Sequence, residues 1–468
     1  MLTHPTSLTF AGGAGTVTGS KFLVTHGTTR VLLDCGIFQG LAPLWERNWA
    51  PPPFDPRTLT AVVLSHAHLD HVGYLPVLVR EGFTGPVYCT PATASLLEVT
   101  LRDTAQLGEE DAQRAHRYEL AASTSGAPTE PATRPLFDLA DVERALARLV
   151  THGYEAPLAI ADDIRLVFRR AGHILGSATV ELGLGARRLV FSGDLGRWGR
   201  PILRDPELVP EADILLVEST HARDHHRADP DAELVRVVNA ARERGGVLVV
   251  PAFAVGRTQE LLWRLSDLVR ARRIAPTPIW VDSPMAVAVT DIYCRHPEEH
   301  DLDMQRLLAE GRCPLRVRDY FIAREPDESR SLAGLDGPSI IIAGNGMATG
   351  GRVLEHLLRL LPEPKNTVLL VGFQAEGTRG RALRDGASSV RIHGHEVPVR
   401  AAIETIDGLS AHADRDELTR WLRGFTRPPA RTFVVHGEPN AAEAMVSLIA
   451  GELGWRAEVA VDGVTVDL

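Results

Sequence analysis

The sequence predicts an α/β protein built from layers of strands and helices, and three observations support this prediction. Side chains of metal-binding types follow several apolar runs that have the length of buried strands. In the middle of the chain, short apolar runs alternate with helical patterns, as in a parallel sheet with crossover helices. The hydrophobic content of 44% in 468 residues is ordinary for a globular chain of roughly two to four domains.

The densest group of metal-binding side chains lies in AVVLSHAHLDHVG, residues 61–73. On the extended backbone after the apolar run, His66 and His68 project from the same face and can share one ion. Asp70 has the position of a helix N-cap, which would turn it and His71 in another direction. We therefore expect two neighbouring ions. Imidazole and carboxylate donors favour zinc, and manganese or iron would accept the same ligands.

Further metal-binding side chains follow other predicted strands. Asp34, Asp194, Glu218 and His436 each end an apolar run, and His173 precedes another one. Each alone has an ordinary explanation as a turn residue, a helix cap or a surface histidine. Because sites in layered α/β folds form at strand ends, their joint occurrence beside residues 66–71 predicts a single metal centre.

Composition constrains the cellular location of the protein and the residue types that can bind the metal. No basic segment with a following apolar run begins the chain, and no apolar stretch approaches the ~20 residues of a membrane span, so we expect a cytoplasmic protein without membrane contact. The four cysteines form no CxxC pair, which indicates reduced packing residues and leaves the ligands to histidine and aspartate. A low-complexity stretch at 121–135 is predicted to be a surface loop.

The net charge of −10 argues against a protein coated in positive charge for nucleic-acid binding, although it permits a local basic groove. Only two of the 50 basic residues are lysines, so arginine is the default cation of this chain and an arginine in a given motif is weak support for phosphate recognition.

Between about residues 220 and 405 the pattern changes to four strand–loop–helix units, which predict a doubly wound parallel sheet. The units occupy residues 246–265, 278–293, 339–360 and 367–386. Their small-residue loops either form anion-binding cradles at helix N-termini or are ordinary turns, and local sequence does not separate these interpretations. GNGMATGG lacks the GK[ST] ending of a P-loop, so no nucleotide cofactor is expected.

The motifs in their order resemble the metallo-β-lactamase superfamily. Asp34, HAHLDH, His173 and Asp194 match its general motifs, while Glu218 in VEST, His412 in LSAHAD and His436 in VVHGE resemble the additional motifs of its β-CASP nucleases. The resemblance includes bacterial and archaeal relatives of the subunit that cleaves eukaryotic pre-messenger RNA at its 3′ end. It implies an αββα sandwich with an inserted Rossmann-like β-CASP domain, divided as 1–221, 222–404 and 405–468.

The resemblance also implies roles for individual residues. One zinc ion would be held by the residues at 66, 68 and 173 and the other by those at 70, 71 and 436, namely His66, His68, His173, Asp70, His71 and His436. Asp194 would bridge the two ions, and Asp34 would orient ligand histidines from behind. The residues expected to contact substrate are Arg257, Ser283, Arg352, Thr378, Arg379 and Ser410.

One segment departs from the family pattern. The family commonly continues VEST with Tyr-Gly-Asp, whereas this chain has HARDHH at 221–226, which puts the substrate preference in doubt more than metal binding. We interpret His221, His225 and His226 as a surface hinge between domains.

The implied reaction is phosphodiester hydrolysis by a hydroxide shared between two metals, giving 5′-phosphate and 3′-hydroxyl products. Asp70, Glu218 and His412 are the expected catalytic residues, with His412 giving a proton to the departing oxygen and Glu218 holding its ring. The expected partner is single-stranded RNA, cut endonucleolytically in RNA processing or decay. The sequence does not decide whether the chain forms a homodimer. Basic residues are expected to gather in the cleft around Arg257, Arg352 and Arg379.

Three alternatives remain. A small-molecule hydrolase of thioesters or lactones would share the metal ligands without needing His412, Glu218 or a large insert. A DNA-processing nuclease is the closer alternative, but the family position matching His436 tends to be valine in DNA enzymes and histidine in RNA enzymes. A noncatalytic scaffold would be expected to have lost ligands, and this chain keeps all of them.

Overall fold

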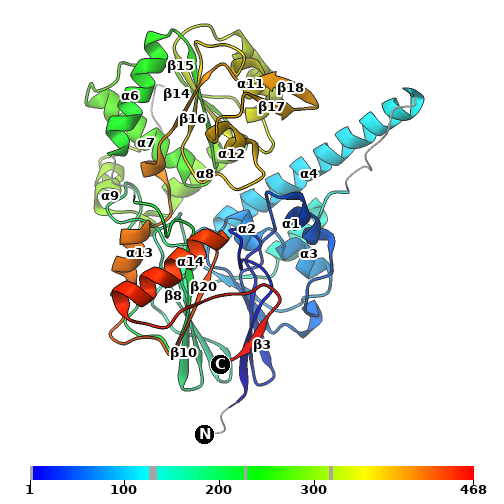
Figure 1. The fold of residues 1–468 in the computed structure, drawn as a ribbon, viewed down its shortest axis with the longest axis vertical. Helices are drawn as coiled ribbons and strands as arrows, with labels where there is room; N and C mark the ends of the chain where they lie inside the picture. The colour runs from blue at the N-terminus through cyan, green and yellow to red at the C-terminus, as the bar shows by residue number, and fades with distance from the viewer. Residues whose placement is uncertain (1–3, 126–133, 226–228, 316–319) are drawn as a thin grey trace.

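The computed structural model describes residues 4–125, 134–225, 229–315 and 320–468. Figure 1 shows two lobes, a β-sandwich that contains both chain termini and an α/β lobe inserted between β11 and β20. Helix α4 (Pro91–Ser125) extends outward from the junction of the lobes.

Two seven-stranded sheets form the sandwich. The first sheet has the order β22 (Thr465–Asp467), β1 (Thr6–Phe10), β2 (Phe22–His26), β3 (Thr29–Leu33), β4 (Ala61–Val63), β5 (Val87–Cys89) and β6 (Leu149–Thr151). The second sheet has the order β21 (Glu458–Val459), β20 (Arg431–Val435), β11 (Ile214–Glu218), β10 (Arg187–Phe191), β9 (Ala178–Leu184), β8 (Ile164–Arg170) and β7 (Leu158–Ala161).

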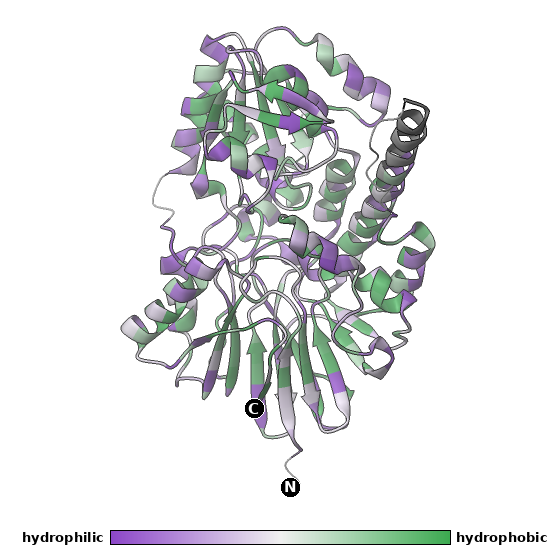
Figure 2. Ribbon diagram, turned by 45° about the vertical axis from the view of Figure 1, so that its right-hand side comes forward, coloured by the Kyte–Doolittle hydropathy of each residue, from purple (hydrophilic) through white to green (hydrophobic). Residues whose placement is uncertain are grey.

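Alternating side chains explain why each sheet is buried on both faces. In β10, Leu189 and Phe191 point into the core between the sheets, while Val190 packs in a second cluster beneath the outer helices. Figure 2 shows the hydrophobic colouring continuing along these strands. The outer layers are α2 (Leu69–Val72), α3 (Leu75–Arg80), α4 and α5 (Leu139–Leu146) on one side, and α13 (Arg415–Leu422) and α14 (Pro439–Leu448) on the other. A short helix, α1 (Ala42–Glu46), follows β3.

The second lobe is built on a six-stranded, fully parallel sheet. Its order is β14 (Tyr320–Ile322), β13 (Ile279–Asp282), β15 (Ser339–Gly344), β12 (Val247–Ala252), β16 (Thr367–Leu370) and β19 (Ala402–Thr405). The helices are α6 (Pro230–Glu243), α7 (Arg257–Arg270), α8 (Pro284–Arg295), α9 (Leu302–Ala309), α10 (Pro326–Ser331), α11 (Val353–Leu360) and α12 (Arg379–Arg384), with a hairpin of β17 (Ser389–Ile392) and β18 (His395–Pro398). Separate hydrophobic clusters cover its two faces, so the predicted doubly wound arrangement is confirmed.

Two local predictions need correction. Asp70 is not a helix N-cap, because α2 begins at Leu69 and His68 occupies the cap position. In the stretch predicted as a loop at 121–135, residues 121–125 are the end of α4, and residues 126–133 lie outside the described residues. No helix in the described ranges combines the length and the apolar character that crossing a membrane requires.

Candidate metal centre

The first group of candidate ligands gathers histidines from two separate loops around Asp194. Nε2 of His66 and Nε2 of His173 lie 3.1 Å and 3.2 Å from Nδ1 of His68. Oδ2 of Asp194 lies 3.5 Å from Nε2 of His66 and 3.7 Å from Nε2 of His173. Four donor atoms therefore surround one point near the ends of β4 and β10.

The second group faces the other oxygen of the same carboxylate. Nε2 of His71 lies 3.1 Å from Nε2 of His436 and 3.3 Å from Oδ1 of Asp194. Oδ2 of Asp70 lies 3.8 Å from Nε2 of His71 and 3.5 Å from Nε2 of His436. Asp194 therefore stands between the two groups, with one oxygen toward each.

Asp34 fixes the orientation of the second group. Its Oδ2 accepts a hydrogen bond from Nδ1 of His71 at 2.7 Å, and its two oxygens also accept bonds from the backbone N–H and hydroxyl of Ser65. Because the ring proton is on Nδ1, Nε2 of His71 has a lone pair that is directed at the site. The backbone at Gly36 packs directly against the backbone at Asp70, and a Cβ at Gly36 would lie 1.6 Å from the carbonyl oxygen of Asp70.

Burial and charge divide the site electrostatically. Burial lowers the pKa of His68 to about 4 and those of His66 and His173 well below the usual range, which keeps these imidazoles neutral as metal ligands must be. Burial would also lower the pKa of His71, but Asp194, Asp34 and Asp70 raise it well above its usual range. These carboxylates thus favour positive charge at this end of the site.

The donor set fits divalent zinc ions. In a tetrahedral site with zinc–nitrogen distances of about 2.0–2.1 Å, neighbouring donor atoms are separated by roughly 3.3–3.4 Å, close to the spacings within both groups. Within the described ranges, Oδ1 of Asp194 is buried and accepts no hydrogen bond. A bridging position between two cations would satisfy this oxygen.

Glu218 and His412 form a third group with Asp194. Nδ1 of His412 is 3.4 Å from Oε1 of Glu218, which also accepts the backbone N–H of Leu195 at 2.7 Å, while Oε2 accepts that of Thr220 at 3.2 Å. Burial would lower the pKa of His412, but Glu218, Asp194 and Asp70 raise it. Glu218 is held by backbone donors and in turn stabilises a protonated His412.

The pocket over these residues has mainly apolar walls. Loops at the carboxyl ends of β12, β15 and β16 contribute Phe253, Met347 and Phe373, and the sandwich contributes Val17 and Leu69. The sequence prediction missed these residues. The loop sequences PAFAVG and GFQAEG contain the only aromatic residues of the small-residue loops, and this signal could have identified Phe253 and Phe373.

The residues expected to contact substrate are dispersed. Arg257 and Ser410 line this pocket. Ser283 and Thr378 cap the N-termini of α8 and α12 through their hydroxyl oxygens. These caps use backbone donors that an anion-binding cradle would need, which favours the interpretation of these two loops as ordinary turns.

Arg352 and Arg379 bind the insert itself. Arg352 donates to Asp282 at 2.8 Å and to the carbonyl groups of Ala323 and Arg324 at 2.9 Å and 2.7 Å. Arg379 donates to the carbonyl groups of residues 348, 349 and 391. These contacts give both residues a structural role, and substrate binding by them stays a prediction.

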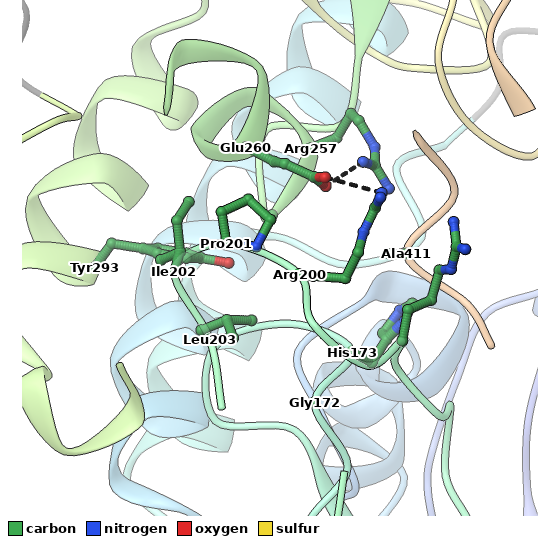
Figure 3. Close-up of a pocket in the computed structure, with 12 residues that line it drawn as sticks. Gly172, His173, Arg200, Pro201, Ile202, Leu203, Arg257, Glu260, Tyr293 and Ala411 are labelled. Atoms are coloured by element: carbon green, nitrogen blue, oxygen red, sulfur yellow. Dashed lines mark hydrogen bonds and ion pairs between the residues drawn. The ribbon is translucent and has the colours of Figure 1, made fainter. Parts of the chain in front are cut away.

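Arginines do gather behind the metal centre, in a second pocket between the lobes (Figure 3). Arg200 follows Asp194 closely in sequence and pairs with Glu260 at 2.8 Å, while Arg257 and Arg264 pair with the same carboxylate at 2.5 Å and 2.9 Å. These three arginines lower the pKa of Glu260 to about 2, although burial would raise it. Arg200, in DLGRWGR, was not among the predicted site residues.

The interpretation of the 221–226 segment as a surface hinge is wrong for His221. Its side chain is buried, and its ring centroid lies 5.7 Å from that of His412. His225 is partly exposed and pairs with Asp416 at 2.9 Å, and His226 lies outside the described residues.

The sandwich, the inserted lobe and the two histidine–aspartate groups are those of a metal-dependent hydrolase, and the chain belongs to the metallo-β-lactamase superfamily. The superfamily description matches residues 14–250, a Beta-Casp domain matches 258–383, and a Zn-dependent metallo-hydrolase RNA specificity domain matches 396–460. The resemblance inferred from the motifs is therefore confirmed.

Individual relatives match over almost the whole chain. Ribonuclease TTHA0252 of Thermus thermophilus is 38% identical over 94% of this chain and 95% of its own length. Transcription termination factor FttA of Methanocaldococcus jannaschii is 32% identical over 92% of this chain and 67% of its own length. A crystal structure of a protein of unknown function from Enterococcus faecalis matches with a TM-score of 0.54 at 14% identity, over 99% of this chain and 100% of that one, and supports the fold alone.

Proposed function

We propose that this protein is a zinc-dependent ribonuclease that hydrolyses phosphodiester bonds in single-stranded RNA. The observation that carries the proposal is the pairing of the two ligand groups around Asp194 with the Glu218–His412 pair beside them. Phosphodiester hydrolysis needs both parts, because it creates negative charge on the phosphate and releases an alkoxide that must be protonated. The similarity to a chain named as a ribonuclease adds support.

In this proposal one zinc ion would be held by the histidines at 66, 68 and 173, and the other by Asp70, His71 and His436, with Asp194 available to both. Bound there, the two ions would supply Lewis acidity and a deprotonated water at neutral pH. Asp34 keeps His71 in the tautomer that presents a lone pair. Thr220 contacts Nδ1 of His436 at 3.1 Å and orients that ring in a similar way.

His412 is the proposed proton donor for the departing oxygen. Its Nδ1 faces Glu218, so a proton on Nε2 is available to the substrate. The raised pKa favours the protonated ring at neutral pH, which a general acid requires before the reaction.

A single strand suits the pocket better than a duplex. The residues that line it come from both lobes, so one phosphate must pass between Leu69 on one side and Phe253 or Phe373 on the other. The phenylalanine rings can stack on unpaired bases, and stacking of this kind does not depend on base sequence.

The test is incubation of the purified protein with end-labelled single-stranded RNA, duplex RNA and single-stranded DNA of the same sequence, followed by sizing of the products. We expect the single-stranded RNA to be cut to products with 5′-phosphate ends, and a chelator to abolish cleavage. His412→Ala should lose most of the cleavage rate. His393→Ala is the control and should keep it, because His393 lies on the β17–β18 turn near Glu355.

Preferential cleavage of DNA would indicate that the protein is a DNA-processing nuclease instead. Rapid hydrolysis of a thioester or lactone with no cleavage of either nucleic acid would replace it by a small-molecule hydrolase.

A further inference from the structure

A chain of three polar side chains runs from the surface to the metal pocket beside His412. Oδ2 of Asp224 lies 2.5 Å from Nδ1 of His221, and Nε2 of His221 lies 3.0 Å from Oγ of Ser410. Asp224 is half exposed, whereas His221 and Ser410 are 8% and 3% exposed. The chain therefore links a solvated carboxylate to a buried hydroxyl.

The direction of the hydrogen bonds follows from the acceptor at the outer end. An ionised carboxylate can only accept, so Nδ1 of His221 carries a proton. When the ring holds this proton alone, Nε2 is an acceptor. The Ser410 hydroxyl consequently donates its proton to His221. The backbone N–H of His412 donates to the same Oγ at 3.3 Å. Oγ keeps one lone pair and no proton for a ligand.

Ser410 lines the pocket that contains Asp194 and His412, so its hydroxyl borders the proposed substrate site. Phosphate oxygens are acceptors and cannot satisfy the lone pair of Oγ. The sugar of each ribonucleotide carries a 2′-hydroxyl, which is a donor next to the phosphate and is missing from DNA.

We propose that Asp224 and His221 position Ser410 as a hydrogen-bond acceptor for the ribose 2′-hydroxyl of a nucleotide next to the scissile phosphate. The inference rests on the proposed ribonuclease function and adds a structural basis for choosing RNA over DNA. His221 and Asp224 act through Ser410 and are positioning residues. The edge of Phe373 meets the His221 ring at a centroid distance of 5.8 Å and an angle of 89°, which restricts rotation of the imidazole.

The experiment uses RNA oligonucleotides with one modified sugar at each position around the mapped cleavage site. A 2′-deoxy sugar removes the hydroxyl, and a 2′-fluoro sugar keeps a polar atom that cannot donate. Under single-turnover conditions, both modifications at one position should slow cleavage by the wild-type protein roughly tenfold, because the Ser410 oxygen stays unsatisfied. Ser410→Ala should cleave the modified and unmodified RNAs at similar rates.

Variants of the outer residues test the relay separately. In Asp224→Asn the amide can donate to Nδ1, which shifts the ring proton to Nε2 and frees the Ser410 hydroxyl to donate. The loss of cleavage rate caused by the 2′-fluoro sugar should then shrink more than the loss caused by the 2′-deoxy sugar. His221→Ala should lose both penalties, and added imidazole should restore them. His225→Ala is the matched control, because its ring pairs with Asp416 and is not bonded to Ser410.

A full penalty for both modifications in Ser410→Ala, with wild-type zinc content, would overturn the inference while leaving the ribonuclease function in place. The same holds if the wild-type protein cleaves every modified RNA at the unmodified rate. Failure of the wild-type protein to cleave any unmodified RNA would instead refute the proposed function, and the inference with it.

Discussion

Replacing Glu260 by glutamine tests the coupling between the lobes. Its carboxylate joins Arg200 of the sandwich to Arg257 and Arg264 of the insert, and its side chain is only 12% exposed. Its pKa falls from 4.5 to about 2 in the folded chain. A tenfold change in an equilibrium constant corresponds to about 1.4 kcal/mol, so this depression stabilises the folded state by roughly 3 kcal/mol. We expect Glu260→Gln to lose about 3 kcal/mol at pH 7, within the range for breaking a buried ion pair.

The pH dependence has a defined sign. Because the folded pKa is lowered, the stabilisation is complete above about pH 4.5 and is lost as the pH falls toward 2. At pH 3.5 the difference between the wild-type chain and Glu260→Gln should have shrunk by roughly 1 kcal/mol. Urea unfolding at a series of pH values, followed by circular dichroism, measures this difference without adding salt that would screen the charges.

The matched control is Glu143→Gln, which removes the carboxylate of an exposed pair with Arg102, the side chains being 52% and 45% exposed. It should leave the free energy of unfolding nearly unchanged, because an ion pair in water gains little from its charges. If Glu260→Gln were as stable as this control at pH 7, or if its deficit grew on acidification, the assignment of Glu260 as the buried counterion would be refuted.

Three further predictions follow from the site. Asp194→Ala should lower the zinc content below two equivalents, measured by elemental analysis, and abolish cleavage; full zinc content would rule out the bridging position. His412→Ala should keep the zinc of the wild-type chain and lose about two to four orders of magnitude in rate, whereas His68→Ala should lose both. Arg352→Ala should lower the melting temperature, because its guanidinium binds Asp282 and two backbone carbonyl groups; an unchanged melting temperature with a raised KM for RNA would indicate that it mainly contacts substrate.

The convergence of the candidate ligands in space was predictable because strand geometry is regular. Asp194, Glu218 and His436 follow or end β10, β11 and β20, which are parallel neighbours in one sheet. Carboxyl ends of adjacent parallel strands lie at the same edge, so apolar runs ending in acidic residues or histidine indicated a shared location. The predicted N-cap, Asp70, lies two residues after the observed one, His68, because Asp and His can both precede a helix and local sequence does not decide between them.

The arginine contacts were not predictable in the same way. Whether a guanidinium is available to a phosphate depends on which acceptors reach it in the folded chain. Arg352 is engaged by Asp282, 70 positions away, and Arg200 by Glu260, 60 positions away. No local pattern encodes these pairings. His221 was misjudged for a similar reason, because its burial depends on Ser410 and Phe373 from segments that follow the insert strands.

The connectivity links the insert to the chemistry of the site. The chain leaves the sandwich after Glu218, the last residue of β11, and its return from β19 leads through Ser410 to His412. The two partners of the His412–Glu218 contact therefore lie in the segments that enter and leave the inserted lobe. In the proposed function, a movement of the inserted lobe would act on both connections at once. Closure over a substrate would then also align His412 with Glu218, since the loops carrying Phe253 and Phe373 belong to the same lobe.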